Sequence, residues 1–130
     1  MLVLGTATAL LLTISLGLIL LVGGIFEGMC ANRIAAEYPS PDARHKAVVF
    51  ERDCGATTGF SAQVTILGRD EVLRNEAGNV CVVEADGDSP DEINAEISVS
   101  WDGPDELVIR SLGVPKRLES RVDDVRVSYR

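Results

Sequence analysis

Charged residues are absent from the first 26 positions, which hold no Asp, Glu, Lys, Arg or His. The uninterrupted apolar stretch at residues 2–26 exceeds the about 20 residues that a membrane-spanning helix needs. It is also longer than the apolar part of a signal peptide, about 7–15 residues, and no basic residue stands before it. We therefore predict a transmembrane anchor at residues 1–26. The alternatives are a cleaved signal segment that ends before Ala31 and a lipoprotein with its lipid on Cys30, which the charge of Glu27 and the bulk of Met29 disfavour.

Basic residues are scarce in the rest of the sequence, where 12 Lys and Arg face 20 Asp and Glu, giving a net charge of −8. Binding to nucleic acid needs clustered Lys and Arg, so nucleic acid is not expected as a partner. The same average charge argues against a domain that lies flat on anionic lipid. The membrane is instead expected to be contacted through residues 2–26.

Histidine occurs once, at His45, and the sequence contains no Cys-x-x-Cys pair and no Gly-rich phosphate loop. A single histidine nearly excludes zinc-hydrolase and Ser-His-Asp chemistry. The acidic stretch at residues 86–92 fails the EF-hand pattern, because Pro90 and Asp91 occupy positions that need a ligand and a glycine. We therefore expect no catalytic residue, no metal site, no cofactor and no enzyme activity.

Only three cysteines are present, Cys30, Cys54 and Cys81. A disulfide between Cys30 and Cys54 is the favoured interpretation, and closing a loop of that length stabilises a fold by about 3 kcal/mol. The alternatives are a buried Cys54 thiol and a reactive thiolate activated by His45. The strand between His45 and Cys54 would hold them about 20 Å apart, which speaks against that pair.

Small residues follow Cys54 and form a candidate binding loop. The backbone amides of Gly55, Thr57, Thr58 and Gly59 can cradle an anion. The competing interpretation is a loop that satisfies its own backbone through the threonine hydroxyls and the conformational freedom of glycine. We favour the second interpretation.

The remaining sequence is patterned for short strands. Phe60, Ala62, Val64 and Ile66 alternate with polar residues, as in a strand with one buried face. The pattern predicts an all-β fold, an antiparallel meander of about six strands in a small sandwich or partial barrel, preceded by one N-terminal transmembrane helix. Strands are expected at residues 46–52, 60–66, 79–84, 95–101 and 106–110, followed by a hairpin of 116–120 with 125–129.

Domain boundaries follow from the same pattern. Residues 27–42 are expected to form a stalk and a turn, because Pro39 and Pro41 bias the chain toward extended and turn conformations. Residues 43–130 are expected to form the β-domain. The candidate core comprises Val48, Phe50, Phe60, Val64, Ile66, Val80, Val82, Ile97, Val99, Trp101, Leu107, Ile109, Val125 and Val127.

Residues 38–42, residues 46–50 and, above all, residues 52–60 (Arg-Asp-Cys-Gly-Ala-Thr-Thr-Gly-Phe) carry a resemblance. The chain resembles a family of small bacterial envelope proteins of unknown function that have an N-terminal apolar segment and a Cys soon after it. The resemblance implies a location in the bacterial envelope and implies no activity. Cys81 departs from the family pattern, where an apolar strand residue is expected, and is interpreted as an ordinary buried thiol.

Two opposing signals bear on orientation. Arg33 follows the span closely, which by the positive-inside rule favours a cytoplasmic C-terminal domain. The cysteine placement and the family resemblance favour an extracytoplasmic domain in a single-pass bacterial membrane protein, and this is the prediction we retain.

The expected function is that of a non-enzymatic binding module tethered to the membrane, with another envelope protein as its partner. The alternative is a thiol-dependent enzyme or redox protein that uses Cys54. A cation-responsive domain that uses residues 86–92 is a third hypothesis.

Overall fold

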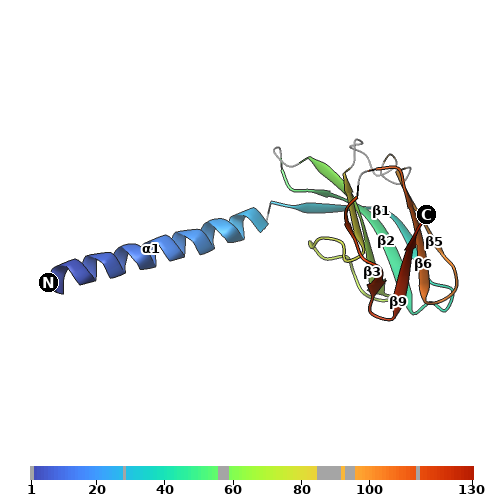
Figure 1. Cartoon of the computed structure of the whole chain (residues 1–130), viewed down its shortest axis with the longest axis horizontal. Coiled ribbons are helices and arrows are strands. Elements are labelled where there is room, and N and C mark those ends of the chain that lie inside the picture. Colours follow the sequence, from blue (N-terminus) through green and yellow to red (C-terminus); the bar gives the residue numbers. More distant parts are fainter. Residues whose placement is uncertain (1, 28, 56–58, 85–91, 93–95, 114) are drawn as a thin grey trace. The chain divides into compact units, whose positions relative to one another are not determined.

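The chain forms two compact units, Met1–Cys30 and Ala31–Arg130, in the computed structural model (Figure 1). The structure describes residues 2–27, 29–55, 59–84, 92, 96–113 and 115–130. The first unit contains one helix, and the second is built mainly from strands.

The helix α1 (Leu2–Glu27) is the predicted apolar segment. Within it, Gly5–Val22 has a mean hydropathy of 2.2, and none of it is buried by the protein. Thr8 and Thr13 donate their hydroxyl hydrogens to backbone carbonyls three residues earlier, so neither hydroxyl depends on water for a partner. The helix is therefore long and apolar enough to span a membrane, and a signal sequence meets the same criteria.

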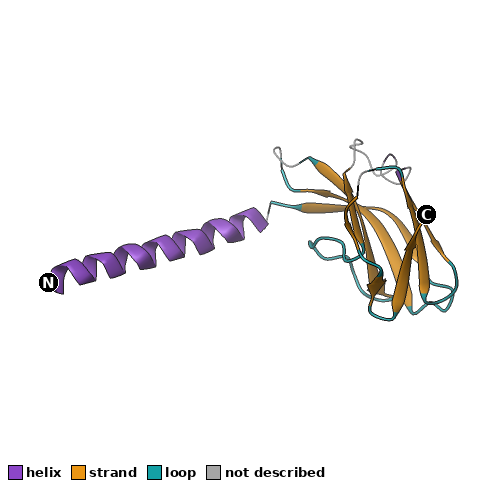
Figure 2. Ribbon diagram, viewed as in Figure 1, coloured by secondary structure: helices purple, strands orange, loops and turns teal. Residues whose placement is uncertain are grey.

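The second unit is an all-β sandwich of two sheets, which confirms the predicted fold class (Figure 1, Figure 2). Sheet A has the strand order β1-β2-β3-β4-β7, and sheet B has the order β5-β6-β9-β8. Sheet A consists of β1 (Ala31–Pro39), β2 (His45–Asp53), β3 (Phe60–Gly68), β4 (Cys81–Glu84) and β7 (Pro115–Leu118). Sheet B consists of β5 (Ile97–Trp101), β6 (Glu106–Ser111), β8 (Arg121–Val122) and β9 (Val125–Tyr129).

Strands β2 to β4 follow one another as an antiparallel meander, as predicted, and the chain then leaves that pattern. Strand β7 returns to sheet A beside β4, whereas β9 lies in sheet B and pairs in parallel with β6. The predicted hairpin of residues 116–120 with 125–129 is therefore wrong. Its arms belong to different sheets because the chain crosses between them at Glu119, which donates its N–H to Val80, and Ser120, which accepts from Val127.

Residues 31–39, which the sequence assigned to a stalk, form the edge strand β1 and pair antiparallel with β2 along its length. Arg33 on β1 adds an ion pair of 2.7 Å to the buried Glu51 on β2. The strand signal is weak here because an edge strand pairs on one side only and tolerates polar residues and proline. The β-domain therefore begins at Ala31 and not at residue 43.

The interior between the sheets is aliphatic. It consists of Ala47, Val49, Ala62, Val64, Ile66, Val80, Cys81, Val83, Ile97, Val99, Leu107, Ile109, Val125 and Val127. Nine predicted core residues are confirmed there, and Trp101 packs against the cluster. Phe60 and Val82 were wrong: Phe60 is 37% exposed at the start of β3, and the neighbours of Val82, Cys81 and Val83, hold the inward positions of β4.

Val48 and Phe50 are fully buried, as predicted, but on the outer face of sheet A. Ala47 and Val49 take the inward positions of β2, and alternation along the strand then directs Val48 and Phe50 to the other side. The predicted phase of β2 was therefore wrong. The four consecutive apolar residues of this strand have no alternation from which the inward face can be read.

The segment at residues 69–78, which we term the cover loop, is fixed to this outer face. Asn32 on β1 donates its side-chain N–H groups to the carbonyls of Arg74 (2.9 Å) and Glu76 (2.8 Å). On β3, Gln63 Oε1 accepts from the Gly78 N–H at 2.7 Å. Side chains of the first and third strands therefore hold the cover loop across sheet A, where β2 lies between them.

Candidate functional site

The predicted disulfide between Cys30 and Cys54 is present. In the ladder of β1 and β2, Ala31 lies opposite Asp53, so the two cysteines are the next pair along the same ladder. A disulfide-bonded Cys54 has no thiolate that can act as a nucleophile. The thiol-dependent alternative lacks its reactive group in this state of the protein.

Cys81 is the free cysteine and is fully buried in the interior. Burial raises the pKa of its thiol to about 11, so the thiol stays protonated at neutral pH. Burial also raises the pKa of the nearby Tyr129 to about 12. The Tyr129 hydroxyl donates to the carbonyl of Glu119 at 2.7 Å. Both groups are structural, in agreement with the interpretation of Cys81 as an ordinary buried thiol.

The predicted binding loop after Cys54 is described only at its ends. Gly55 and Gly59 have φ angles of 107° and 67°, which favour glycine. Asp53 Oδ1 accepts from the Gly55 N–H at 2.9 Å, so the loop begins as a turn satisfied by its own side chain. Thr57 and Thr58 lie outside the described residues, and their role in binding stays a prediction.

His45 lies at the opposite end of β2 from Cys54, so the two cannot form a catalytic pair. Its Nε2 atom is 3.3 Å from Asp124 Oδ1, in the turn before β9. Next to it, Arg44 donates to Asp42 at 2.6 Å, and this hydrogen bond is the main cause that holds the pKa of Asp42 well below its usual range. These contacts join two turns at one end of the sandwich and have a structural role.

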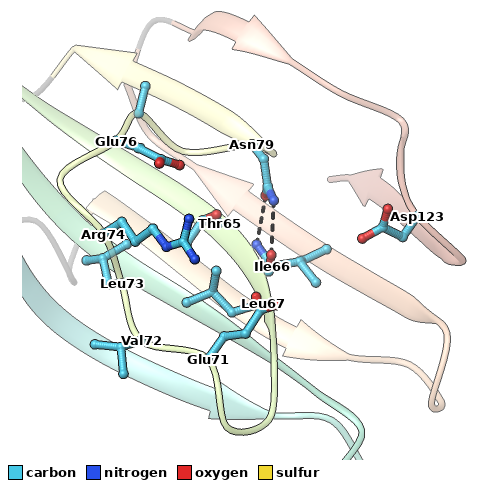
Figure 3. A pocket seen from close by; sticks show the side chains of 11 residues that line it. Thr65, Ile66, Leu67, Glu71, Val72, Leu73, Arg74, Glu76, Asn79 and Asp123 are labelled. Atoms are coloured by element: carbon cyan, nitrogen blue, oxygen red, sulfur yellow. Dashed lines mark hydrogen bonds between the residues drawn. The ribbon is translucent and has the colours of Figure 1, made fainter.

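A recess with a volume of about 560 Å³ opens between the cover loop and β3 (Figure 3). This volume lies within the range of about 300–1,000 Å³ that is common for ligand sites. The recess is lined by Thr65, Ile66, Leu67, Glu71, Val72, Leu73, Arg74, Glu76, Ala77, Asn79 and Asp123. No function is predicted from the sequence for any of these residues.

Gly78 and Asn79 position the cover loop against β3. The side-chain amide of Asn79 accepts from the Ile66 N–H at 2.8 Å and donates to the Ile66 carbonyl at 3.0 Å, as a neighbouring strand would (Figure 3). Gly78 approaches β3 so closely that a Cβ atom would lie 2.6 Å from the carbonyl oxygen of Val64. This Gly-Asn pair directly before a strand is the one sequence signal that could have located the recess.

The recess combines apolar and charged side chains. Leu67, Val72 and Leu73 supply apolar surface. Its charged groups are the guanidinium of Arg74 and the carboxylates of Glu71, Glu76 and Asp123. The lining contains no Cys, His or Ser, so it offers none of the usual nucleophile–base pairs. Such a surface suits reversible binding of a side chain or a short segment.

Two further sequence features have different outcomes. Trp101 donates its indole N–H to the carbonyl of Tyr38 at 2.8 Å and packs against the interior, so it joins the sheets at their β1 and β5 edges.

Residues 86–91 lie outside the described residues, so the cation-responsive hypothesis stays a prediction. Within the described part of the chain, no group of three or more His, Cys, Asp or Glu residues is arranged to hold a metal ion.

Comparison of the chain with protein-family models, with curated proteins and with solved structures finds no match.

Proposed function

We propose that the chain is a single-pass bacterial membrane protein whose β-domain is an extracytoplasmic, non-enzymatic interaction module. One observation carries the proposal: an apolar helix that is not covered by protein is followed closely by a sandwich closed with a disulfide. Uncovered apolar side chains favour a lipid environment, and a disulfide favours an oxidising compartment. The bacterial envelope in particular rests on the family resemblance.

The recess beneath the cover loop is the proposed contact site, and its proposed occupant is a segment of another envelope protein. Val72 at this site is 78% exposed and offers an apolar contact. Three carboxylates line the recess against one arginine, so an apolar segment with an adjacent basic residue fits it best.

A non-enzymatic role is supported by the state of the candidate reactive groups. Cys54 is in a disulfide, Cys81 is buried in the interior, and His45 is paired with Asp124. Each group that the sequence offered for nucleophilic chemistry is thereby assigned a structural contact.

The orientation is tested by labelling intact bacterial cells that express the full chain with a membrane-impermeant maleimide. Cys30 and Cys54 are expected to react only after mild reduction, and Cys81 is expected to stay unlabelled because it is buried. Labelling that requires cell lysis would show a cytoplasmic domain and overturn the proposal. Labelling of Cys54 without reduction would restore the thiol-dependent alternative.

The contact site is tested with a photo-reactive amino acid placed at Val72. The matched control carries the same amino acid at Leu112, which is 89% exposed and does not line the recess. The same protein is expected to be captured repeatedly from Val72 in intact cells and not from Leu112. Equal capture at both positions, or substrate turnover by the purified chain, would contradict the proposed role.

A further inference from the structure

Four exposed arginines gather on the outer face of sheet B: Arg110 on β6, Arg121 on β8, Arg126 on β9 and Arg130 directly after β9. The residues that alternate with them on β6 and β9 belong to the interior, so these arginines point outward. Arg121 lies directly opposite Arg126 in the ladder of β8 and β9, on the same face. We term this surface the arginine face.

The charges of the arginine face are only partly neutralised. Arg126 pairs with Glu106 at 3.2 Å, and Arg130 lies 3.9 Å from Asp102. Arg110 and Arg121 form no ion pair with any residue in the described ranges. Two of the four arginines are thus paired with a carboxylate and two are not, in a chain whose net charge is −8.

The opposition of Arg121 and Arg126 points to an anionic partner. Like charges directly opposite each other in a ladder destabilise the pairing, so the isolated domain does not benefit from this arrangement. An anion placed over the two guanidinium groups would relieve their repulsion. Guanidinium groups bind phosphate oxygens through paired N–H donors, which makes phosphate a well-matched anion.

The acidity of the rest of the chain does not prevent such contact. The two sheets of a sandwich lie about 10 Å apart, and charges separated by more than about 8 Å are largely screened at physiological ionic strength. Carboxylates beyond sheet A therefore act only weakly across the arginine face. The net charge of −8 is a sum over the whole chain, so it does not describe the charge of the arginine face by itself.

The short connection between α1 and β1 determines which phosphate-bearing surface lies nearest to the β-domain. Only residues 28–30 separate the end of α1 at Glu27 from the start of β1 at Ala31. Three residues span at most about 10 Å, so the domain cannot move far from the bilayer that holds the helix. A phospholipid surface thus stays close to the domain. Arg121 and Arg126 flank the turn that contacts His45, at the end of β2 opposite the disulfide, so the arginine face meets this surface when the domain lies along it.

We infer that the arginine face docks on anionic phospholipid headgroups of the membrane in which α1 is inserted. The inference rests on the proposed membrane anchor and adds a second contact, between the β-domain and the lipid surface. Docking would fix the orientation of the domain and thereby the direction in which the recess is presented.

The inference is tested with the full, oxidised chain reconstituted into vesicles that carry an energy-transfer acceptor on a small fraction of their headgroups. The donor dye is attached at Ser100→Cys, an exposed position on the arginine face. Transfer is expected to rise about twofold when about 30% of a zwitterionic lipid is replaced by phosphatidylglycerol. It should return to the zwitterionic level at about 1 M salt, where the Debye length is about 3 Å.

Two double variants with the same change in net charge separate docking from a general charge effect. Arg110→Ser with Arg121→Ser should abolish the rise in transfer, and neither side chain has an ion pair to lose within the described ranges. Arg69→Ser with Arg117→Ser, on the cover loop and on β7 of sheet A, should leave the rise unchanged. Equal behaviour of the two variants would overturn the inference.

Extraction with alkaline carbonate distinguishes a failure of the docking inference from a failure of the proposed membrane anchor. A chain that stays embedded in both lipid mixtures and shows equal transfer overturns the docking inference alone. A chain that carbonate removes from the vesicles overturns the membrane anchor and the docking inference together.

Discussion

The outer faces of the two sheets differ in whether a loop covers them. The outer face of sheet A is covered by the loop at residues 69–78 and buries Val48 and Phe50 completely. The outer face of sheet B has no comparable loop among the described residues, and it exposes Ser98, Ser100 and the arginine face. One face serves as a second small core, and the other is available for contact.

This difference is visible in the burial pattern along each strand. Strands β2 and β3 each bury five residues in succession, whereas β5 alternates buried and exposed positions and β6 buries only Leu107, Val108 and Ile109 in succession. A strand covered on both faces reads as a continuous apolar run, and a strand covered on one face alternates. The long buried runs of β2 and β3 therefore match the presence of the cover loop on the outer face of sheet A.

The largest expected effect tests whether the covered face is a true core. Phe50→Ala should lower the free energy of unfolding by about 3–5 kcal/mol, because it leaves a cavity beneath the cover loop. Phe60→Ala, at a position that is 37% exposed, should cost less than half as much. The measurement is urea unfolding of the full chain in detergent, followed by fluorescence of Trp101, the single tryptophan. Equal costs would show that the cover loop does not create a second core.

The next effect concerns the disulfide at the end of β1 and β2. Replacing Cys30 and Cys54 together with Ala should lower the free energy of unfolding by about 3 kcal/mol, because the unfolded chain regains the freedom of an open loop. A reducing agent should produce a similar loss in the parent chain and none in the double variant. A parent chain whose stability does not respond to the reducing agent would contradict a stabilising role.

A smaller effect tests how the cover loop is seated. Gly78→Ala should cost about 1–3 kcal/mol, because its Cβ would lie 2.6 Å from the backbone oxygen of Val64, which cannot move easily. Gly68→Ala is the matched control, since its Cβ would meet only the flexible Glu71 side chain at 3.5 Å. The control should change the free energy of unfolding by less than about 0.5 kcal/mol. Indistinguishable variants would mean that the loop has room to shift.

The smallest effect is expected on the open face. Ser98→Ala and Ser100→Ala, at exposed positions of β5, should each change the free energy of unfolding by no more than about 0.5 kcal/mol. The same urea titration measures them. A loss comparable to that of Phe50→Ala would show that sheet B is also covered, and the contrast between the two faces would disappear.

The sequence predicted those parts of the structure for which a local pattern of residues is compatible with a single conformation or pairing. The charge-free stretch predicted the helix, and the alternation from Ala62 to Ile66 predicted the inward face of β3. Cys30 and Cys54 form the disulfide that was favoured from the sequence. The edge strand β1 was missed because its polar residues resemble those of a linker. The parallel pairing of β6 with β9 depends on packing between distant segments and leaves no local signal.

The recess was not predictable for a similar reason. Its cover loop is held by Asn32, which lies 42 and 44 residues from its acceptors on Arg74 and Glu76. Nothing in a polar stretch between two strands shows whether it extends into solvent or folds back onto a sheet. The tertiary contact decides this, and the lining residues become neighbours only once it forms.

The position of the disulfide also determines how the domain carries mechanical force. In the proposed anchored state, a pull between the anchor and a bound partner would enter the sandwich at Ala31, on an edge strand that could be peeled away one residue pair at a time. The link from Cys30 to Cys54 passes that load directly to β2, which is flanked by β1 and β3. A domain anchored in the proposed way would therefore be pulled without its first strand separating from β2.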